Sequence, residues 1–251
     1  MTLRPAILAL ALSMSLSGCI INVNAANAQP KTHSHQQLTL DTQAIEQLVI
    51  QAGAGELVIV GVEGQTAIIL EADIYSYQGV DYTLTLEQQS NKAMLKAEFD
   101  SSNNFNRSPY IDLHLSVPKH LLLQIDDGSG RIDISNVDAN MDITDGSGDI
   151  QIAGGQAIKI NDGSGGIHIT HSQGKMSIDD GSGEIFVEHV KGDIDIQDGS
   201  GDMSIAHIDG KVTVTDGSGG ISIRHALGLT LNETGSGDVS FEDIQGPVSM
   251  H

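Results

Sequence analysis

Short segments of alternating hydrophobic and polar residues run through the second half of the chain. Met141 and Ile143 are separated by one polar residue, and so are Ile150 and Ile152 a few residues later. This period of two is typical of strands that bury one face. Segments of four or five residues are too short to be stable alone. The pattern therefore predicts many short strands that stack into a larger β structure.

A tandem repeat connects these segments. Gly-Ser-Gly recurs seven times, at steps of 17 or 18 residues, starting at residues 128, 146, 163, 181, 199, 217 and 235. Periods near 18 to 20 residues are typical of solenoids. We therefore predict an all-β fold in which residues 126–251 form a parallel β-solenoid of about seven 18-residue, two-strand coils. Coils stacked about 4.8 Å apart would share a narrow Ile/Val core between two parallel sheets.

The preceding region, residues 38–125, has longer strand-like segments and no repeat. They are Leu38–Leu40, Leu48–Ile50, Leu57–Val60, Ala67–Ile74, Tyr82–Leu86, Ala93–Phe99 and Tyr110–Val117. We expect an antiparallel β region that caps the first coil, because an exposed strand edge invites aggregation.

One coil departs from the repeat. If the 18-residue spacing of the other coils continued here, Thr230 and Asn232 would point inward and the leucines at 229 and 231 would point outward. Since leucines favour the core, we predict a β-bulge or a local register shift near this segment.

The N-terminus has the features of a lipoprotein signal peptide. Arg4 precedes the apolar segment 6–16, which is too short to span a bilayer. The segment ends in Leu16-Ser17-Gly18-Cys19, which resembles the lipobox of bacterial lipoproteins, in which the enzyme cuts before the cysteine and acyl chains are attached to it. We therefore expect residues 1–18 to be removed and Cys19, the only cysteine, to be lipidated. The residue after it, Ile20, favours the outer membrane by the same resemblance.

An ordinary signal cleavage after Ala26-Asn27-Ala28 is the alternative, and it would release a soluble protein. The apolar segment ends about nine residues before that site, which favours Cys19. Residues 19–37 are expected to form a flexible tether, with His33 and His35 as solvated linker residues.

Charge restricts the partners. The chain has 33 acidic residues against 12 Lys and Arg, a formal charge of −21, and the second half holds 22 of the acids. A protein with this much negative charge repels the phosphates of nucleic acids. We therefore exclude nucleic acid as a partner.

Three repeated positions become columns when coils stack. The Asp column comprises Asp127, Asp145, Asp162, Asp180, Asp198 and Asp216, with Thr234 at the seventh repeat. Asp before Gly accepts backbone N–H groups in turns, and stacked carboxylates should repel, raise some pKa values or recruit cations. Carboxylates also suit Ca²⁺, but the calcium nonapeptide needs Asp where this chain has Ile132, Ile150 and Ile167. We interpret the column as turn-forming.

The His column comprises His171, His189, His207 and His225, with Asn136 and Asp243 at the same phase. It could bind Zn²⁺ or Cu²⁺ or respond to protons, but a column lacks the converging geometry of a zinc site. We favour stacked corner residues and name no metal ligand. The serines of the seven repeats are interpreted as turn residues, because catalysis needs a nucleophile once.

Established catalytic and cofactor motifs are absent, including G-x-S-x-G, phosphate loops, H-E-x-x-H and CxxC. No catalytic residue and no cofactor is therefore predicted.

The tandem Gly-Ser-Gly-x-φ-x-φ units resemble the bacterial β-strand-repeat family of unknown function whose members are often called "putative adhesin". The resemblance implies a β-solenoid and a cell-envelope location, and it carries over no catalytic residues. We expect a non-enzymatic envelope protein anchored in the membrane through Cys19, whose acidic solenoid is an adhesion or interaction scaffold for a protein, a polysaccharide or its own copies. The alternative is a cation-binding module that uses the Asp or His column for Ca²⁺ or Zn²⁺.

Overall fold

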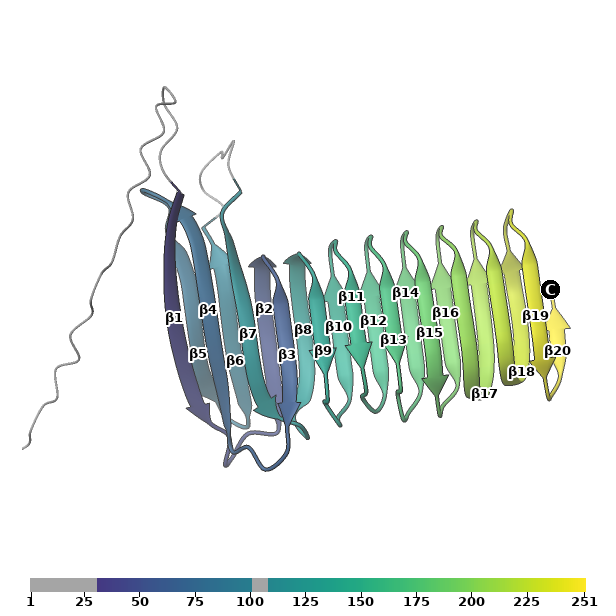
Figure 1. Ribbon diagram of the computed structural model, residues 1–251, viewed down its shortest axis with the longest axis horizontal. Coiled ribbons are helices and arrows are strands. Elements are labelled where there is room, and N and C mark those ends of the chain that lie inside the picture. Colours follow the sequence, from purple (N-terminus) through teal and green to yellow (C-terminus); the bar gives the residue numbers. More distant parts are fainter. Residues whose placement is uncertain (1–30, 101–107) are drawn as a thin grey trace, which may run out of the picture.

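The computed structural model describes residues 31–100 and 108–251, and these form strands joined by short corners (Figure 1). The first ten strands are β1 (Lys31–Asp41), β2 (Gln47–Ala54), β3 (Leu57–Val62), β4 (Ala67–Tyr77), β5 (Tyr82–Gln89), β6 (Lys92–Phe99), β7 (Tyr110–Pro118), β8 (Leu122–Ser129), β9 (Ile132–Ser135) and β10 (Met141–Asp145). The others are β11 (Ile150–Ala153), β12 (Ile158–Asp162), β13 (Ile167–Thr170), β14 (Met176–Asp180), β15 (Ile185–Val190), β16 (Ile194–Asp198), β17 (Met203–Asp216), β18 (Ile221–Thr234), β19 (Val239–Ile244) and β20 (Val248–Met250). Within these residues there is no helix long and apolar enough to cross a membrane.

Two strand layers face each other along the rod. From β8 onward every coil contributes one strand to each layer, and each strand pairs in parallel with its counterpart one coil away. The long strands β17 and β18 pass through a corner and so contribute to both layers. The predicted all-β fold with a parallel solenoid is confirmed.

The core is a continuous apolar filling between the two layers. In β10, for example, every second residue is buried and the residues between are exposed. Ile, Val, Leu and Met from successive coils stack inside in this way. Burial at about 25 cal/mol per Å² stabilises the stack. No coil can bury its apolar face alone, so each depends on its neighbours.

The region before residue 126 is not purely antiparallel. Strands β2 and β3 pair in parallel with β8 and β9, and they form an additional coil. This coil also pairs in parallel with β6 and β7 on its other side. Figure 1 shows β2 and β3 inserted between β6–β7 and β8–β9, out of sequence order. The solenoid therefore begins earlier in the chain than the repeat indicates, and the interpretation of residues 38–125 as antiparallel holds only for part of the region.

The antiparallel pairings lie at the cap. In one layer β4 pairs with β7, and β1 pairs with β4; in the other, β5 pairs with β6. Strand β1 starts at Lys31, so the expected tether at 19–37 is wrong for residues 31–37, which form a regular ladder with β4. The weak apolar content of this segment hid the strand, since an edge strand needs little burial.

The irregular coil contains the predicted register shifts. The pairing register of β17 with β18 shifts twice, between Ile208 and Lys211 and between Val214 and Thr215. These shifts bring Leu229 and Leu231 opposite Val212 and Val214, and both leucines are fully buried. The two shifts offset each other, so the core remains apolar through this coil.

Glycine makes the tight corners possible. Gly165 has φ +143°, and a Cβ there would overlap the backbone carbonyl of Gly148 one coil away. Gly128 would meet Gly53 in the same manner, which identifies Gly53-Ala54-Gly55 as a degenerate first corner. The corner backbones are thus too close for any side chain at these positions.

We predict that Gly165→Ala lowers the free energy of unfolding by about 1–3 kcal/mol or more. A residue with a Cβ pays about that much for this backbone conformation alone. Urea unfolding followed by circular dichroism measures the loss. Gly228→Ala is the matched control, because a Cβ there meets neighbours only at 3.5 Å or more. Equal stability of the two variants would contradict the steric account of the corners.

Candidate functional site

The Asp column points into the solenoid. Its six side chains are only 1–6% exposed, and they lie in register across consecutive coils. The reason is parity: Met141, Ile143 and Asp145 occupy alternate positions of β10, so the aspartate follows the two core residues inward. The same alternation was available in the sequence and would have predicted the burial.

Each carboxyl group of the Asp column is incompletely hydrogen-bonded. In three coils the Oδ1 atom accepts the backbone N–H of the corner serine two residues later, at 3.1–3.2 Å. This confirms the turn-forming role for Asp180, Asp198 and Asp216. By contrast, neither carboxyl oxygen of Asp145 or Asp162 has a hydrogen-bond partner among the described residues. The Oδ2 atoms of all six aspartates are buried without a partner. Buried polar atoms without a partner are rare and costly.

Burial raises the pKa of every carboxyl group in the Asp column. For Asp127 it raises the pKa to about 7, with a further contribution from the charge of Asp145. Burial raises the pKa values of Asp162 and Asp198 to about 6, helped by neighbouring members of the column, while corner N–H groups act in the opposite direction. The pKa values of Asp145, Asp180 and Asp216 are also raised by burial.

The His column lies at the opposite corners and is exposed. All four residues have φ between +56° and +63°, and Asn136 and Asp243, at the same phase of the repeat, have φ +57° and +55°. Asn, Asp and His are the non-glycine residues best tolerated in this left-handed region, which explains the shared phase. The rings stack at 4.7–5.1 Å between centroids. The structure confirms the stacked-corner interpretation.

Carboxylates accompany the His column. Glu188 Oε1 lies 3.7 Å from His189 Nε2 and 3.9 Å from His207 Nε2, and Asp243 Oδ2 lies 3.1 Å from His225 Nε2. Nevertheless, nowhere in residues 31–100 and 108–251 do three or more His, Cys, Asp or Glu side chains converge on a position suited to a metal ion. Stacking aligns the rings but does not direct them to one point.

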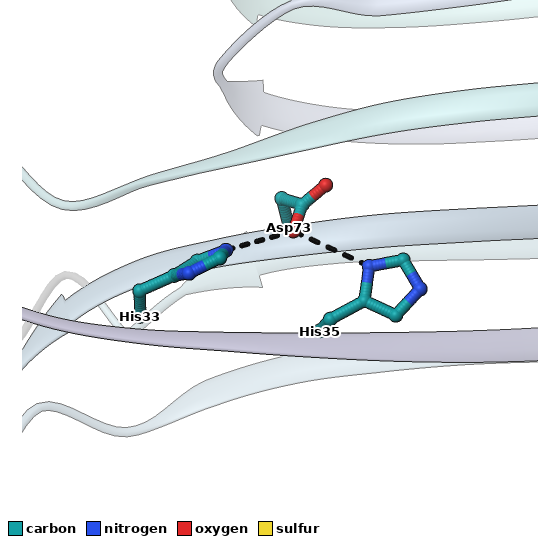
Figure 2. A network of polar contacts seen from close by, with 3 residues as sticks. All are labelled: His33, His35 and Asp73. Atoms are coloured by element: carbon teal, nitrogen blue, oxygen red, sulfur yellow. Dashed lines mark hydrogen bonds and ion pairs between the residues drawn. The ribbon is translucent and has the colours of Figure 1, made fainter. Parts of the chain in front are cut away.

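A polar cluster on the cap was missed from the sequence. Figure 2 shows His33 and His35, both on β1, on either side of Asp73 of β4. Asp73 Oδ1 lies 2.7 Å from His33 Nε2 and 3.2 Å from His35 Nδ1. The hydrogen bond with His33, joined by that with His35, lowers the pKa of Asp73. These histidines therefore hold the edge strand to the cap and are not linker residues.

Aromatic residues extend this cluster. The ring of His33 stacks on Tyr75, and Tyr75 stacks on Tyr110, with centroids 4.6 and 4.7 Å apart. Lys31 Nζ lies 4.7 and 4.1 Å from the centroids of the two tyrosines. The stack crosses β1, β4 and β7 and joins the edge strand to its neighbours in the same layer.

A shallow groove of about 660 Å³ runs along the layer that contains β8, β10, β12, β14 and β16. Its lining includes apolar strand starts such as Met141 and Met176, and the lysines at 159, 175 and 211. Asp142, Asp193 and Asp195 also line it, so the formal charges balance. It is a nearly neutral strip on an otherwise acidic protein.

The last coil exposes residues that are core elsewhere. Phe241 is in register with buried Ile223, and Val248 and Met250 with buried Leu229 and Leu231. The three side chains are 42–56% exposed. Among the described strands, β19 and β20 each pair only with β18, so one backbone edge of each is open. An apolar patch beside an open edge is a typical contact surface.

The model of the family described as Toastrack DUF4097 matches residues 78–245, which is more than half of the chain. The chain belongs to the Toastrack DUF4097 family. No match was found among the curated proteins.

Solved structures resemble this Toastrack chain in fold. A protein from Parabacteroides distasonis described as a "putative lipid binding protein" has 16% identity and a TM-score of 0.51, with 86% of this chain and 96% of that chain covered. A "putative adhesin" from the same organism has 14% identity and a TM-score of 0.45, covering 88% and 97%. One from Bacteroides fragilis has 9% identity and a TM-score of 0.36, covering 87% and 97%. At these identities the likeness shows the fold alone, and it rests on the first structure.

The Toastrack structure leaves one predicted residue without a test. Cys19, the expected lipidation site, lies outside the described residues, and so do the signal peptide and most of the expected tether. Of the three predicted columns, the Asp column is internal and the His column external. They lie on opposite edges of the rod, so the fold does not bring them together.

Because neither column converges on a point, we predict that Ca²⁺ and Zn²⁺ at micromolar concentration leave the thermal midpoint unchanged relative to NaCl of the same ionic strength. Differential scanning calorimetry is the measurement. The double variant His189→Asn and His207→Asn, which keeps a side chain tolerated at this φ, is the matched control. A rise in the midpoint with Zn²⁺ that the double variant loses would instead support the cation-binding alternative.

Proposed function

We propose that this Toastrack protein is a non-enzymatic, lipid-anchored cell-envelope protein whose acidic solenoid serves as an adhesion or interaction scaffold. The observation that carries the proposal is the open terminal coil, where the core residues Phe241, Val248 and Met250 are exposed beside unpaired strand edges. Such an edge can accept a strand of a partner, while apolar side chains supply contact area.

The anchor would set the orientation of the rod. Lys31, where β1 begins, follows Cys19 by twelve residue-to-residue steps. At about 3.3–3.6 Å per residue they cannot extend beyond roughly 43 Å. The cap would therefore lie next to the membrane, and the open coil would be presented at the far end (Figure 1). The resemblance of the lipobox to proteobacterial lipoproteins favours the outer membrane.

The names of the structural relatives support this proposal. They are described as "putative" adhesins or lipid-binding proteins, and none of those reported above is described as an enzyme. A scaffold needs shape and surface, which the stacked coils provide, and it needs no catalytic constellation.

Anchoring is tested by Cys19→Ala. We expect the wild type to sediment with membranes and the variant to move to the soluble fraction, because several acyl chains at about 0.8 kcal/mol per buried methylene anchor a protein stably. Metabolic labelling with a radioactive fatty acid should mark the wild type alone. An unchanged membrane fraction and an unlabelled wild type would overturn the lipid anchor.

Contact through the open coil is tested with immobilised residues 20–251, envelope extract from the producing cells, and the variants Phe241→Ser and Met250→Ser. We expect binding to fall at least tenfold for these variants, because they remove the exposed apolar contacts. Glu242→Gln is the matched control on β19 and should bind like the wild type. No capture, or equal capture by all variants, would count against this surface.

A further inference from the structure

The Asp column poses a charge problem that the scaffold function does not address. Six carboxyl groups are buried in register in consecutive coils, and adjacent members lie about 4.8 Å apart by strand spacing. Within residues 31–100 and 108–251, no lysine, arginine or histidine makes an ion pair with any of them. Six full negative charges in such a row would be strongly unfavourable.

The geometry also provides the means of relief. Every Oδ2 atom in the column is buried and without a partner, while corner N–H groups occupy the Oδ1 side in several coils. A protonated carboxyl group is a donor, and its neighbour one coil away is an acceptor. Protonation would thus convert repelling neighbours into a continuous chain of hydrogen bonds parallel to the rod.

We propose that the Asp column is a shared-proton ladder, in which neighbouring carboxyl groups hold protons between them and fasten the coils together in acid. Each proton that leaves goes to solvent and exposes a carboxylate to its neighbours. The ladder ends at Ala52, which pairs with Asp127, and at Thr234, which pairs with Asp216. Both end residues are uncharged, so the effect is confined to the six coils between them.

The charged groups that act on the ladder are known. They are the aspartates of the Asp column themselves, together with Asp126 and Asp179. These two lie on the outer face of the same strands, and their negative charges favour the protonated form of the buried aspartates. The N–H groups of the corner glycines and serines favour the charged form. Burial is the largest cause of the raised pKa values and the neighbouring carboxylates add to it, so the pKa values of Asp162 and Asp198 are raised to about 6 and that of Asp127 to about 7.

The sign of the pH effect follows from these directions. A carboxyl group whose pKa is higher in the folded chain than the ordinary 3.8 binds its proton more tightly when folded. Its contribution to stability is complete below about pH 4 and is lost as the pH rises through 6 to 7. This is the reverse of ordinary acid denaturation, in which carboxylates stabilise the folded state.

The test compares Asp198→Asn with Asp195→Asn, since both residues lie on β16 but the first points inward and the second outward. Asn keeps the shape and the acceptor for the Ser200 N–H, and it adds a permanent donor. We expect Asp198→Asn to raise the thermal midpoint by about 4 °C or more at pH 7.5 and to leave it nearly unchanged at pH 4.5. Asp195→Asn should show a small difference that does not depend on pH.

A second measurement detects the protons themselves, in the wild type and in the Asp198→Asn variant. Infrared spectroscopy distinguishes protonated carboxyl groups from carboxylates, and ordinary surface acids are ionised at pH 6. We expect the wild type to retain a protonated carboxyl signal at pH 6, and Asp198→Asn to reduce it. A fully ionised protein at pH 6, a pH-independent effect of Asp198→Asn, or a midpoint that falls on exhaustive chelation would overturn the ladder.

Discussion

In-register stacking of short parallel strands is the constraint on which the rest of this structure depends. A strand of four or five residues can persist only when its backbone groups bond to the adjacent coils. The same holds at the corners, where the Gly146 N–H donates to the Asp127 carbonyl of the neighbouring coil at 3.1 Å. Each coil must therefore copy the path of the one beside it. Any residue type that recurs with the repeat therefore forms a column of stacked side chains. The interactions between neighbouring members of a column are repeated in every coil, whether they are favourable or not.

The repeat explains what could be predicted from the sequence. Period-two alternation and the spacing of Gly-Ser-Gly lead directly to the solenoid, its corners and the stacked histidines, because each is a local signal repeated many times. The register shifts around Leu229 could also be predicted, since a phase error in a buried strand must be corrected. The family match and the fold agree with these expectations.

Features that depend on pairing between distant segments could not be predicted. The coil of β2 and β3 precedes the cap strands β4–β7 in sequence but follows them in space. Its corner, Gly53-Ala54-Gly55, lacks both the serine and the aspartate of the repeat. Strand β1 is fixed by contacts that no local pattern announces, such as those of His33 and His35 with Asp73. The direction of the Asp column was predictable, however, because Asp145 has the parity of the core residues Met141 and Ile143.

The two ends of the rod solve the edge problem in different ways, and this difference connects stability to function. At the cap, antiparallel strands, paired polar groups and stacked rings cover the core. At the far end the core residues Phe241 and Val248 are exposed beside open strand edges. A stack with a closed end and an open end has a direction, so contacts made through the open end would all be made with the same orientation. The Asp column runs through the six coils between these ends, from Asp127 to Asp216, and any change in its protonation would alter the coupling of those coils.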